Sequence, residues 1–210
     1  MNDVAVPVAP LTLPYHARVI RTDRLRLRPF THADLNDVLA YYTDPDVVRF
    51  LEWPVYTADE AAWRLKQRTG CVTLAEDHDE LVYAVEPVSG AWQGHVIGEV
   101  IAMVDSVDHR RIEIGWIFRT NTHGNGYATE AARALMDDML SAVNAHKIMA
   151  QLDARNTASA KVAIRLGMVR EALFQDGHLS FDEWNDVTVY GMISQAELEP
   201  HKATSRALAR

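Results

Sequence analysis

Apolar residues recur along this chain with two different spacings, and the spacing predicts which segments are strands and which are helices. Short apolar or alternating runs predict strands over residues 24–30, 80–86, 95–104, 111–118, 147–153, 169–175 and 184–193. Apolar residues on one helical face predict helices over 32–42, 58–68, 127–143 and 157–166. Thr31 caps the first helix, and Thr57 with Glu60 forms a capping box ahead of the second.

The connections between the three central strands predict how those strands pair. Segments 87–94 and 105–110 are turn-rich and too short to hold a crossover helix, so the strands they join are antiparallel neighbours. One strand–helix–strand crossover follows this meander. The order β-α-α-β-β-β-α-β-α-β-β therefore predicts an α/β (α+β) fold with a mixed, mostly antiparallel central sheet flanked by helices.

The chain has 210 residues, which fits one domain with short appendages. We expect a proline-spaced N-terminal arm over residues 1–20 that is loose or laid on the surface, a single domain over 21–196 and a flexible basic tail over 197–210. The apolar loop 50–54, Phe-Leu-Glu-Trp-Pro, is either core packing or a wall of a substrate pocket.

Composition excludes several classes of protein. The formal net charge of −8 argues against binding to nucleic acid or to an anionic membrane surface. The single Cys71 allows no internal disulfide, and no apolar run is long enough to span a bilayer. The histidines are scattered without ligand spacing, so we expect no metal site. A reducing cytoplasm is the expected location. We also expect a monomer or a homodimer, although no feature of the composition selects between them.

The most informative segment is the junction between the strand 111–118 and the helix that starts at Tyr127. The polar loop between them carries Gly124 and Gly126, which let the backbone approach a ligand closely. The first turn of the helix adds free N–H groups and a partial positive charge. Together they predict a site for a phosphorylated cofactor.

Three phosphorylated cofactors are candidate ligands of this loop: a dinucleotide, a nucleotide triphosphate and coenzyme A. A dinucleotide fingerprint matches only two of its three glycines, because Thr129 stands in the third position, and an antiparallel meander precedes the loop. A nucleotide-triphosphate loop needs Lys followed by Ser or Thr, whereas Tyr127 and Ala128 follow Gly126 here. The third candidate is the pyrophosphate of coenzyme A.

Several motifs in order support coenzyme A. Glu113-Ile-Gly-Trp116 is followed by His123-Gly-Asn-Gly126-Tyr-Ala128-Thr-Glu-Ala131, then by Asn156-Thr-Ala-Ser159 and Leu166-Gly-Met168. With TDRLRLRPFTHADL at 22–35 and WNDVTVY at 184–190, this pattern over about residues 20–195 resembles the Gcn5-related N-acetyltransferase (GNAT) superfamily. It is most similar to the branch that includes the ribosomal-protein N-terminal acetyltransferases (RimJ/RimL-type). Departures are His123 for Gln, Arg or Trp, Thr120 for a common proline and Met168 for Phe.

The resemblance implies acetyl-CoA as co-substrate and particular residues as its binding site. The backbone of Ile117 and Phe118 is expected to pair with the pantetheine arm as an added strand would. Asn156 is expected to bond the amide-rich arm, although an N-cap is the alternative role. The pyrophosphate is expected at the amides of the glycine loop, which comprises His123, Gly124, Asn125, Gly126, Tyr127, Ala128 and Thr129.

Direct transfer to an amine requires a base, an oxyanion donor and a partner for the departing thiolate. Glu113 is the first candidate base; its alternative role is an ion pair with Arg110 or Arg111. Glu183 is the second and Glu99 the third. Ser159 is the candidate hydrogen-bond or proton donor to the thiolate, with helix capping as its alternative role, because Ala163 stands where many superfamily members have a tyrosine.

The acceptor is expected to be a primary amine, either the α-amine of a peptide N-terminus or a small molecule such as an antibiotic or polyamine. Acidic residues at Asp44, Asp46, Glu52, Asp176, Asp182 and Glu183 suggest a cationic acceptor. Four tryptophans, Trp53, Trp63, Trp116 and Trp184, are either core residues or walls of the acceptor site. The alternative function is a catalytically silent module that binds acyl-CoA as a sensor or partner.

Overall fold

A computed structural model describes residues 9–180 and 182–194, and its elements follow the predicted order with several short additions. The strands are β1 Tyr15–His16, β2 Ile20–Arg21, β3 Leu25–Arg28, β4 Thr73–Leu74, β5 Glu80–Pro87, β6 Gly98–Ser106, β7 Arg111–Phe118, β8 Lys147–Asp153, β9 Val169–Ser180 and β10 Glu183–Ile193. The α-helices are α1 Leu35–Tyr42, α2 Pro45–Val48, α3 Ala58–Gly70, α4 Tyr127–Ser141 and α5 Thr157–Arg165, with 3-10 turns η1 His32–Asp34 and η2 Thr120–Thr122.

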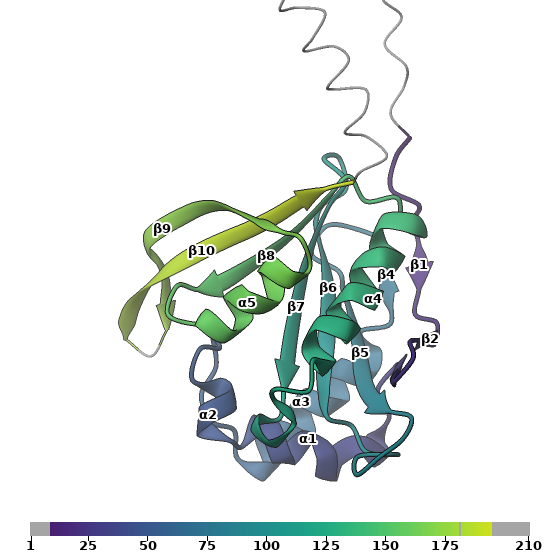
Figure 1. The fold of residues 1–210 in the computed structure, drawn as a ribbon, viewed down its shortest axis with the longest axis vertical. Coiled ribbons are helices and arrows are strands. Elements are labelled where there is room, and N and C mark those ends of the chain that lie inside the picture. Colours follow the sequence, from purple (N-terminus) through teal and green to yellow (C-terminus); the bar gives the residue numbers. More distant parts are fainter. Residues whose placement is uncertain (1–8, 181, 195–210) are drawn as a thin grey trace, which may run out of the picture.

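Eight strands form one sheet in the order β2-β3-β5-β6-β7-β8-β10-β9 (Figure 1). Strands β5, β6 and β7 pair antiparallel as consecutive neighbours, and β7 with β8 is the one parallel pair among the described residues. The predicted meander is therefore confirmed, but the expected single crossover is wrong. Besides α4, which joins β7 to β8, α5 joins β8 to β9 past β10, and β8 and β9 run parallel because both pair antiparallel with β10. The sheet is mixed and mostly antiparallel, because short links allow only antiparallel neighbours whereas α4 carries the chain across to β8.

Strands β7 and β8 pair along only part of their length. The backbone register joins Arg111 with Lys147, Ile112 with Ile148 and Glu113 with Met149, and there it ends. Strand β7 continues to Phe118 while β8 turns its other edge to β10 as far as Asp153. The two strands therefore diverge after Glu113, and over the last five residues of β7 no described strand pairs with its β8-facing edge.

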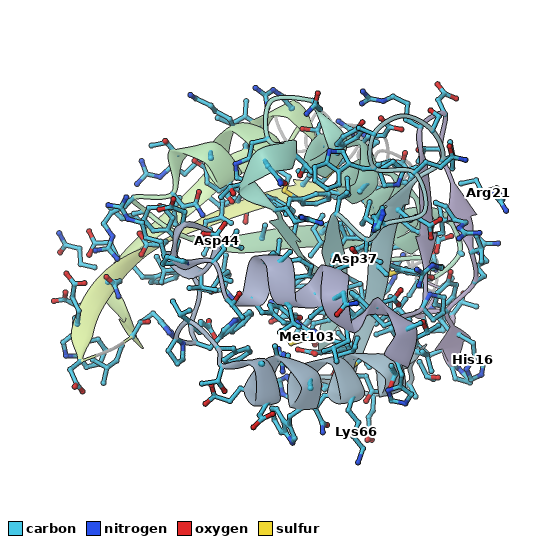
Figure 2. The ribbon with its side chains drawn as sticks, turned by 90° about the horizontal axis from the view of Figure 1, so that it is seen from below. His16, Arg21, Asp37, Asp44, Lys66 and Met103 are labelled. Carbon is cyan, nitrogen blue, oxygen red and sulfur yellow. The ribbon has the colours of Figure 1, made fainter. Side chains whose placement is uncertain are left out.

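Helices cover both faces of the sheet and bury a separate apolar cluster on each. On one face α4 and α5 pack against side chains that include Ile112 and Ile114 of β7. On the other face α1 and α3 lie side by side and pack against Ile117 (Figure 2). Successive side chains of a strand point to opposite faces, so β7 contributes to both clusters. Among the described residues no helix has the length and apolar character needed to cross a membrane.

The N-terminal segment corrects one expectation. Of the two alternatives, residues 9–20 are laid against the domain and are not loose: Leu11 is buried, β1 pairs antiparallel with β4, and the Thr12 N–H donates to the Val143 carbonyl at 2.8 Å. The Tyr15 hydroxyl also bonds Asp138 of α4. The sequence did not predict these pairings, because the closely spaced prolines indicated an irregular segment and a two-residue strand is too short to show a periodic pattern. Residues 1–8, and the predicted tail at 197–210, lie outside the described residues.

Element ends and small elements differ further from prediction. Strand β9 runs five residues past the predicted end and forms a long hairpin with β10 that projects beyond the body of the sheet (Figure 1). Helix α4 ends at Ser141, two residues early. The additional elements α2 and β4 are too short to show a period in the sequence.

Candidate active site

The glycine loop ends in a backbone geometry that favours glycine. Gly124 and Gly126 have φ of +81° and +79°, and Gly126 is the N-cap of α4. The first hydrogen bond of the helix runs from the Glu130 N–H to the Gly126 carbonyl at 3.0 Å. The N–H groups of Tyr127, Ala128 and Thr129 therefore precede the helical ladder and are available to an anion at the positive end of the helix dipole.

Side chains hold this loop in shape. The Arg24 guanidinium donates to the Asn125 carbonyl at 3.0 Å and to the Glu130 carboxylate at 2.6 Å. The Asn125 side chain donates to the Thr122 carbonyl at 3.1 Å, and the His123 ring donates from Nε2 to the Phe118 carbonyl at 3.2 Å. Sequence reasoning missed Arg24, because its place in an alternating strand gave no sign that it meets a loop a hundred residues later.

A cavity of about 900 Å³ opens in front of the loop. Its walls are the N-terminal turn of α4, the length of α5, and Trp116, Ile117 and Phe118 of β7. The charged side chains that line it are Arg24, Arg133, Lys161 and Arg165 against Asp46 and Glu130. Four cations against two carboxylates favour an anionic ligand, in agreement with the exposed N–H groups of α4. All the predicted cofactor-binding residues except Asn125 line this cavity.

A second cavity, of about 400 Å³, lies on the other side of β7 and has the opposite charge. Segment 49–53, the diverging ends of β7 and β8, and the β9–β10 hairpin form its walls. Segment 49–53 meets the hairpin where the Ser180 hydroxyl lies 3.5 Å from the Leu51 carbonyl. The cavity is lined by four carboxylates, Glu52, Glu113, Asp153 and Glu183, against Arg49, Arg155 and His178. It therefore suits a cationic amine.

Glu113 faces the acidic cavity from the last paired position of β7. Burial raises the pKa of Glu113 above its ordinary value, the negative charges of Asp105 and Glu52 raise it further, and a hydrogen bond from Gln151 at 2.9 Å opposes them. Arg111 bonds Asp105 instead of Glu113. A half-buried carboxylate with a raised pKa, held by a neutral amide, has the properties of a general base.

Ser159 and Asn156 lie where the two cavities meet, since both residues line both cavities. The Asn156 side chain accepts the Ser159 N–H at 3.0 Å, so it is the N-cap of α5. The Ser159 hydroxyl accepts the Trp116 indole N–H at 3.2 Å. Neither contact uses the hydroxyl proton of Ser159.

The other two candidate bases, Glu183 and Glu99, are less suited than Glu113 to take a proton from an amine in the acidic cavity. Glu183 lines the acidic cavity, but its side chain is 67% exposed and lies 3.4 Å from Arg155. Glu99 is fully buried and accepts hydrogen bonds from the hydroxyls of Tyr41 and Tyr42 at 3.1 and 2.7 Å, with Arg68 at 2.9 Å. Glu99 lines neither cavity, so its place in the structure is a buried charge network.

The tryptophans and the apolar segment 50–54 lie in different environments: the acidic cavity, the core or the exposed surface. Trp53 and Trp116 line the acidic cavity, whereas Trp63 and Trp184 are 58% and 59% exposed and belong to neither cavity nor core. Leu51 and Trp53 of segment 50–54 pack against the core and also line the acidic cavity. The core role is confirmed, and the role as a wall of a substrate pocket stays a prediction. Within the described part of the chain, no group of three or more His, Cys, Asp or Glu side chains is placed to hold a metal ion.

Comparison with known proteins gives consistent matches. A family model described as an acetyltransferase (GNAT) domain matches residues 24–169. A relative described as the uncharacterized N-acetyltransferase YnaD of Bacillus subtilis (strain 168) is 29% identical over 176 residues, which cover 84% of this chain and 97% of YnaD. An acetyltransferase of the GNAT family from Bacillus anthracis superimposes with a TM-score of 0.75 and 26% identity over 85% of this chain and 99% of that one.

A third comparison concerns the fold alone. A ribosomal L7/L12 α-N-protein acetyltransferase, RimL, solved in complex with coenzyme A, superimposes with a TM-score of 0.70 over 86% of this chain and all of that one. Its sequence identity is 17%.

Proposed function

The chain belongs to the GNAT acetyltransferase family, and from that premise we propose that it transfers the acetyl group of acetyl-CoA to a primary amine held in the acidic cavity beside Glu113. One observation carries the proposal: a cationic cavity and an acidic cavity meet at Ser159, where β7 and β8 diverge. An anionic cofactor and a cationic acceptor thus reach one point from opposite sides.

Acetyl-CoA fits the cationic cavity by charge and by backbone chemistry. The pyrophosphate is placed against the N–H groups of the glycine loop and of the first turn of α4. The pantetheine arm is placed as an added strand along the edge of β7 near Ile117 and Phe118, which β8 leaves without a strand partner after Glu113. The Phe118 carbonyl already accepts the His123 ring, so the arm uses neighbouring backbone groups of this edge. Asn156, already engaged as an N-cap, offers its remaining side-chain hydrogen-bonding groups to the same arm.

In the reaction, Glu113 takes a proton from the acceptor's ammonium group, directly or through water, because only the free amine has a lone pair. The amine nitrogen then forms a bond to the thioester carbon, and backbone N–H groups of the divergent strand stabilise the oxyanion. When the intermediate collapses, the carbon–sulfur bond breaks, the sulfur leaves as a thiolate and the new amide loses its second proton to solvent.

Ser159 is placed to donate a hydrogen bond to that thiolate. A thiol has a pKa of about 8.5, and a serine hydroxyl is a far weaker acid. Full proton transfer from Ser159 to sulfur is therefore uphill, whereas a hydrogen bond from the hydroxyl stabilises the negative charge without it. The thiolate then takes its proton from solvent.

A thiol-release assay tests the function. Acetyl-CoA is mixed with the protein and a panel of primary amines that spans polyamines, amine antibiotics and short peptides with free N-termini, and calorimetry measures the binding of CoA. We expect CoA binding and release with at least one amine. No binding and no release overturn the proposal, and binding without release from any acceptor gives the catalytically silent module instead.

A further inference from the structure

Trp116 and Ser159 make a hydrogen bond whose direction is settled by chemistry. The indole Nε1 of tryptophan donates and has no lone pair to accept. At 3.2 Å from it, the Ser159 oxygen is therefore the acceptor, and the single proton of Ser159 points elsewhere. The bond joins β7 to α5 across 43 positions of sequence.

The rest of the Ser159 environment leaves that proton free for a ligand. The Ser159 N–H is taken by the Asn156 side chain at 3.0 Å, which fixes the start of α5. Within the described ranges, Trp116 is the one hydrogen-bond partner of the Ser159 hydroxyl. Ser159 lines both cavities, so a proton turned away from Trp116 faces the space where they join.

Trp116 and Glu113 stand on opposite faces of β7, because they are three residues apart on a strand. Glu113 lines only the acidic cavity, whereas Trp116 lines both. The divergence of β7 from β8 begins at Glu113, so a ligand that passes between the strands meets the carboxylate on one face and the Trp116–Ser159 pair on the other.

We propose that Trp116 is a positioning residue that orients the Ser159 hydroxyl proton toward the sulfur of bound CoA. The inference rests on the proposed function. A donor bonded to the serine oxygen also polarises its O–H group and makes it a stronger donor, since hydrogen bonds in a chain reinforce one another. Trp116 stabilises the departing thiolate through Ser159 and does not touch it.

A spectroscopic experiment tests the contact independently of activity. The chain has five tryptophans, so an indole 1H–15N spectrum shows up to five peaks, and Trp116→Phe identifies the peak of Trp116 by its loss. Ser159→Ala is expected to move that peak upfield, because the indole proton loses its acceptor. Ser141→Ala is the control, since its hydroxyl bonds the Asp137 carbonyl at the far end of α4. A Trp116 peak that Ser159→Ala leaves in place overturns the inference.

Steady-state kinetics test whether Trp116 positions the Ser159 hydroxyl. Trp116→Phe keeps an aromatic ring and removes the donor, so we expect kcat to fall about tenfold with the KM for acetyl-CoA within about twofold. Ser159→Ala should lower kcat by about tenfold to hundredfold, and the double variant should be no slower than Ser159→Ala, because both changes act on one hydroxyl.

The outcomes distinguish a failure of the positioning role of Trp116 from a failure of the proposed acetyltransferase function. Trp116→Phe with the wild-type kcat, or losses that add in the double variant, overturns the positioning role and leaves the acetyltransferase intact. Ser159→Ala with the wild-type kcat overturns it as well. Wild-type protein that transfers to no amine overturns the proposed function and with it this inference, whatever the indole spectrum shows.

Discussion

The side-chain amide of Gln151 donates to the Glu113 carboxylate at 2.9 Å, just beyond the last backbone pair of β7 and β8. Gln151 lies two residues after Met149, the backbone partner of Glu113, and so projects from the same face of the sheet. The contact spans the start of the divergence between the strands and holds the carboxylate toward the acidic cavity. A neutral partner fixes its direction without the strong stabilisation of negative charge that an arginine would provide.

Glu113→Gln is expected to lower kcat/KM by about a hundredfold or more, because it removes the base and keeps the side chain's shape. In the wild type, the acid limb of the profile of kcat/KM against pH should lie above the pH of an ordinary glutamate, since burial raises the pKa of Glu113. That limb should disappear in the variant. Glu76→Gln, in an exposed turn, is the matched control. Unchanged kcat/KM in Glu113→Gln would remove Glu113 from the mechanism.

The same substitution should not destabilise the fold at neutral pH. A carboxylate whose pKa is raised by folding contributes stability only while protonated, and that contribution is lost as pH rises through its folded pKa. Above that pH, Glu113→Gln removes the cost of a half-buried charge. Urea unfolding should give a free energy of unfolding equal to or above that of the wild type at pH 7.5, and a lower value would contradict this account.

Gly126→Val tests the anion cradle. Gly126 has φ of +79°, which strains a β-branched residue, and an added Cβ lies 3.5 Å from the Arg24 guanidinium. We expect the KM for acetyl-CoA to rise by about tenfold or more. Gly90→Val is the control, because Gly90 has a similar φ of +84° in open space outside both cavities. An unchanged KM for acetyl-CoA in Gly126→Val would contradict the cradle.

Glu99→Gln tests the buried charge network that joins β6 to α1 and α3. Glu99 and Arg68 are 0% and 1% exposed, so removal of one charge leaves the other buried and unpaired. We expect a loss of about 3–5 kcal/mol in the free energy of unfolding, measured with urea. Glu80→Gln should cost less, because Glu80 pairs with the same arginine from a 36% exposed position. Equal losses would show that burial does not govern this network.

Leu11→Ala tests the N-terminal segment as part of the fold. Leu11 is 7% exposed in the same apolar cluster as the helix α4 that carries the glycine loop. We expect a loss of about 2–3 kcal/mol in the free energy of unfolding by thermal or urea denaturation. Val19→Ala, at a position 51% exposed, should stay within about 0.5 kcal/mol of the wild type. An unchanged free energy of unfolding in Leu11→Ala would contradict this packing and favour the loose arm that the prolines indicate.

Local patterns in the sequence predicted much of the fold. The spacing of apolar residues located the long strands and helices, and short links predicted the antiparallel meander that the sheet confirms. Gly126 before Tyr127 and Asn156 before Thr157 marked two helix starts. These features were predictable because backbone geometry and capping depend on residues within about one helical turn. The candidate residues Glu113 and Ser159 came from motif resemblance, and their roles stay predictions.

The tertiary structure decided what the sequence could not. Arg24 reaches the glycine loop across 101 positions, Trp116 reaches Ser159 across 43, and Glu99 is enclosed by side chains from α1 and α3. Each contact joins elements whose proximity depends on the order of strands and on where β7 and β8 stop pairing. No local period encodes that order, because it follows from how whole elements bury their apolar faces against one another. The sequence by itself therefore determined the long elements and the position of the glycine loop, and the folded sheet determined which side chains meet between the two cavities.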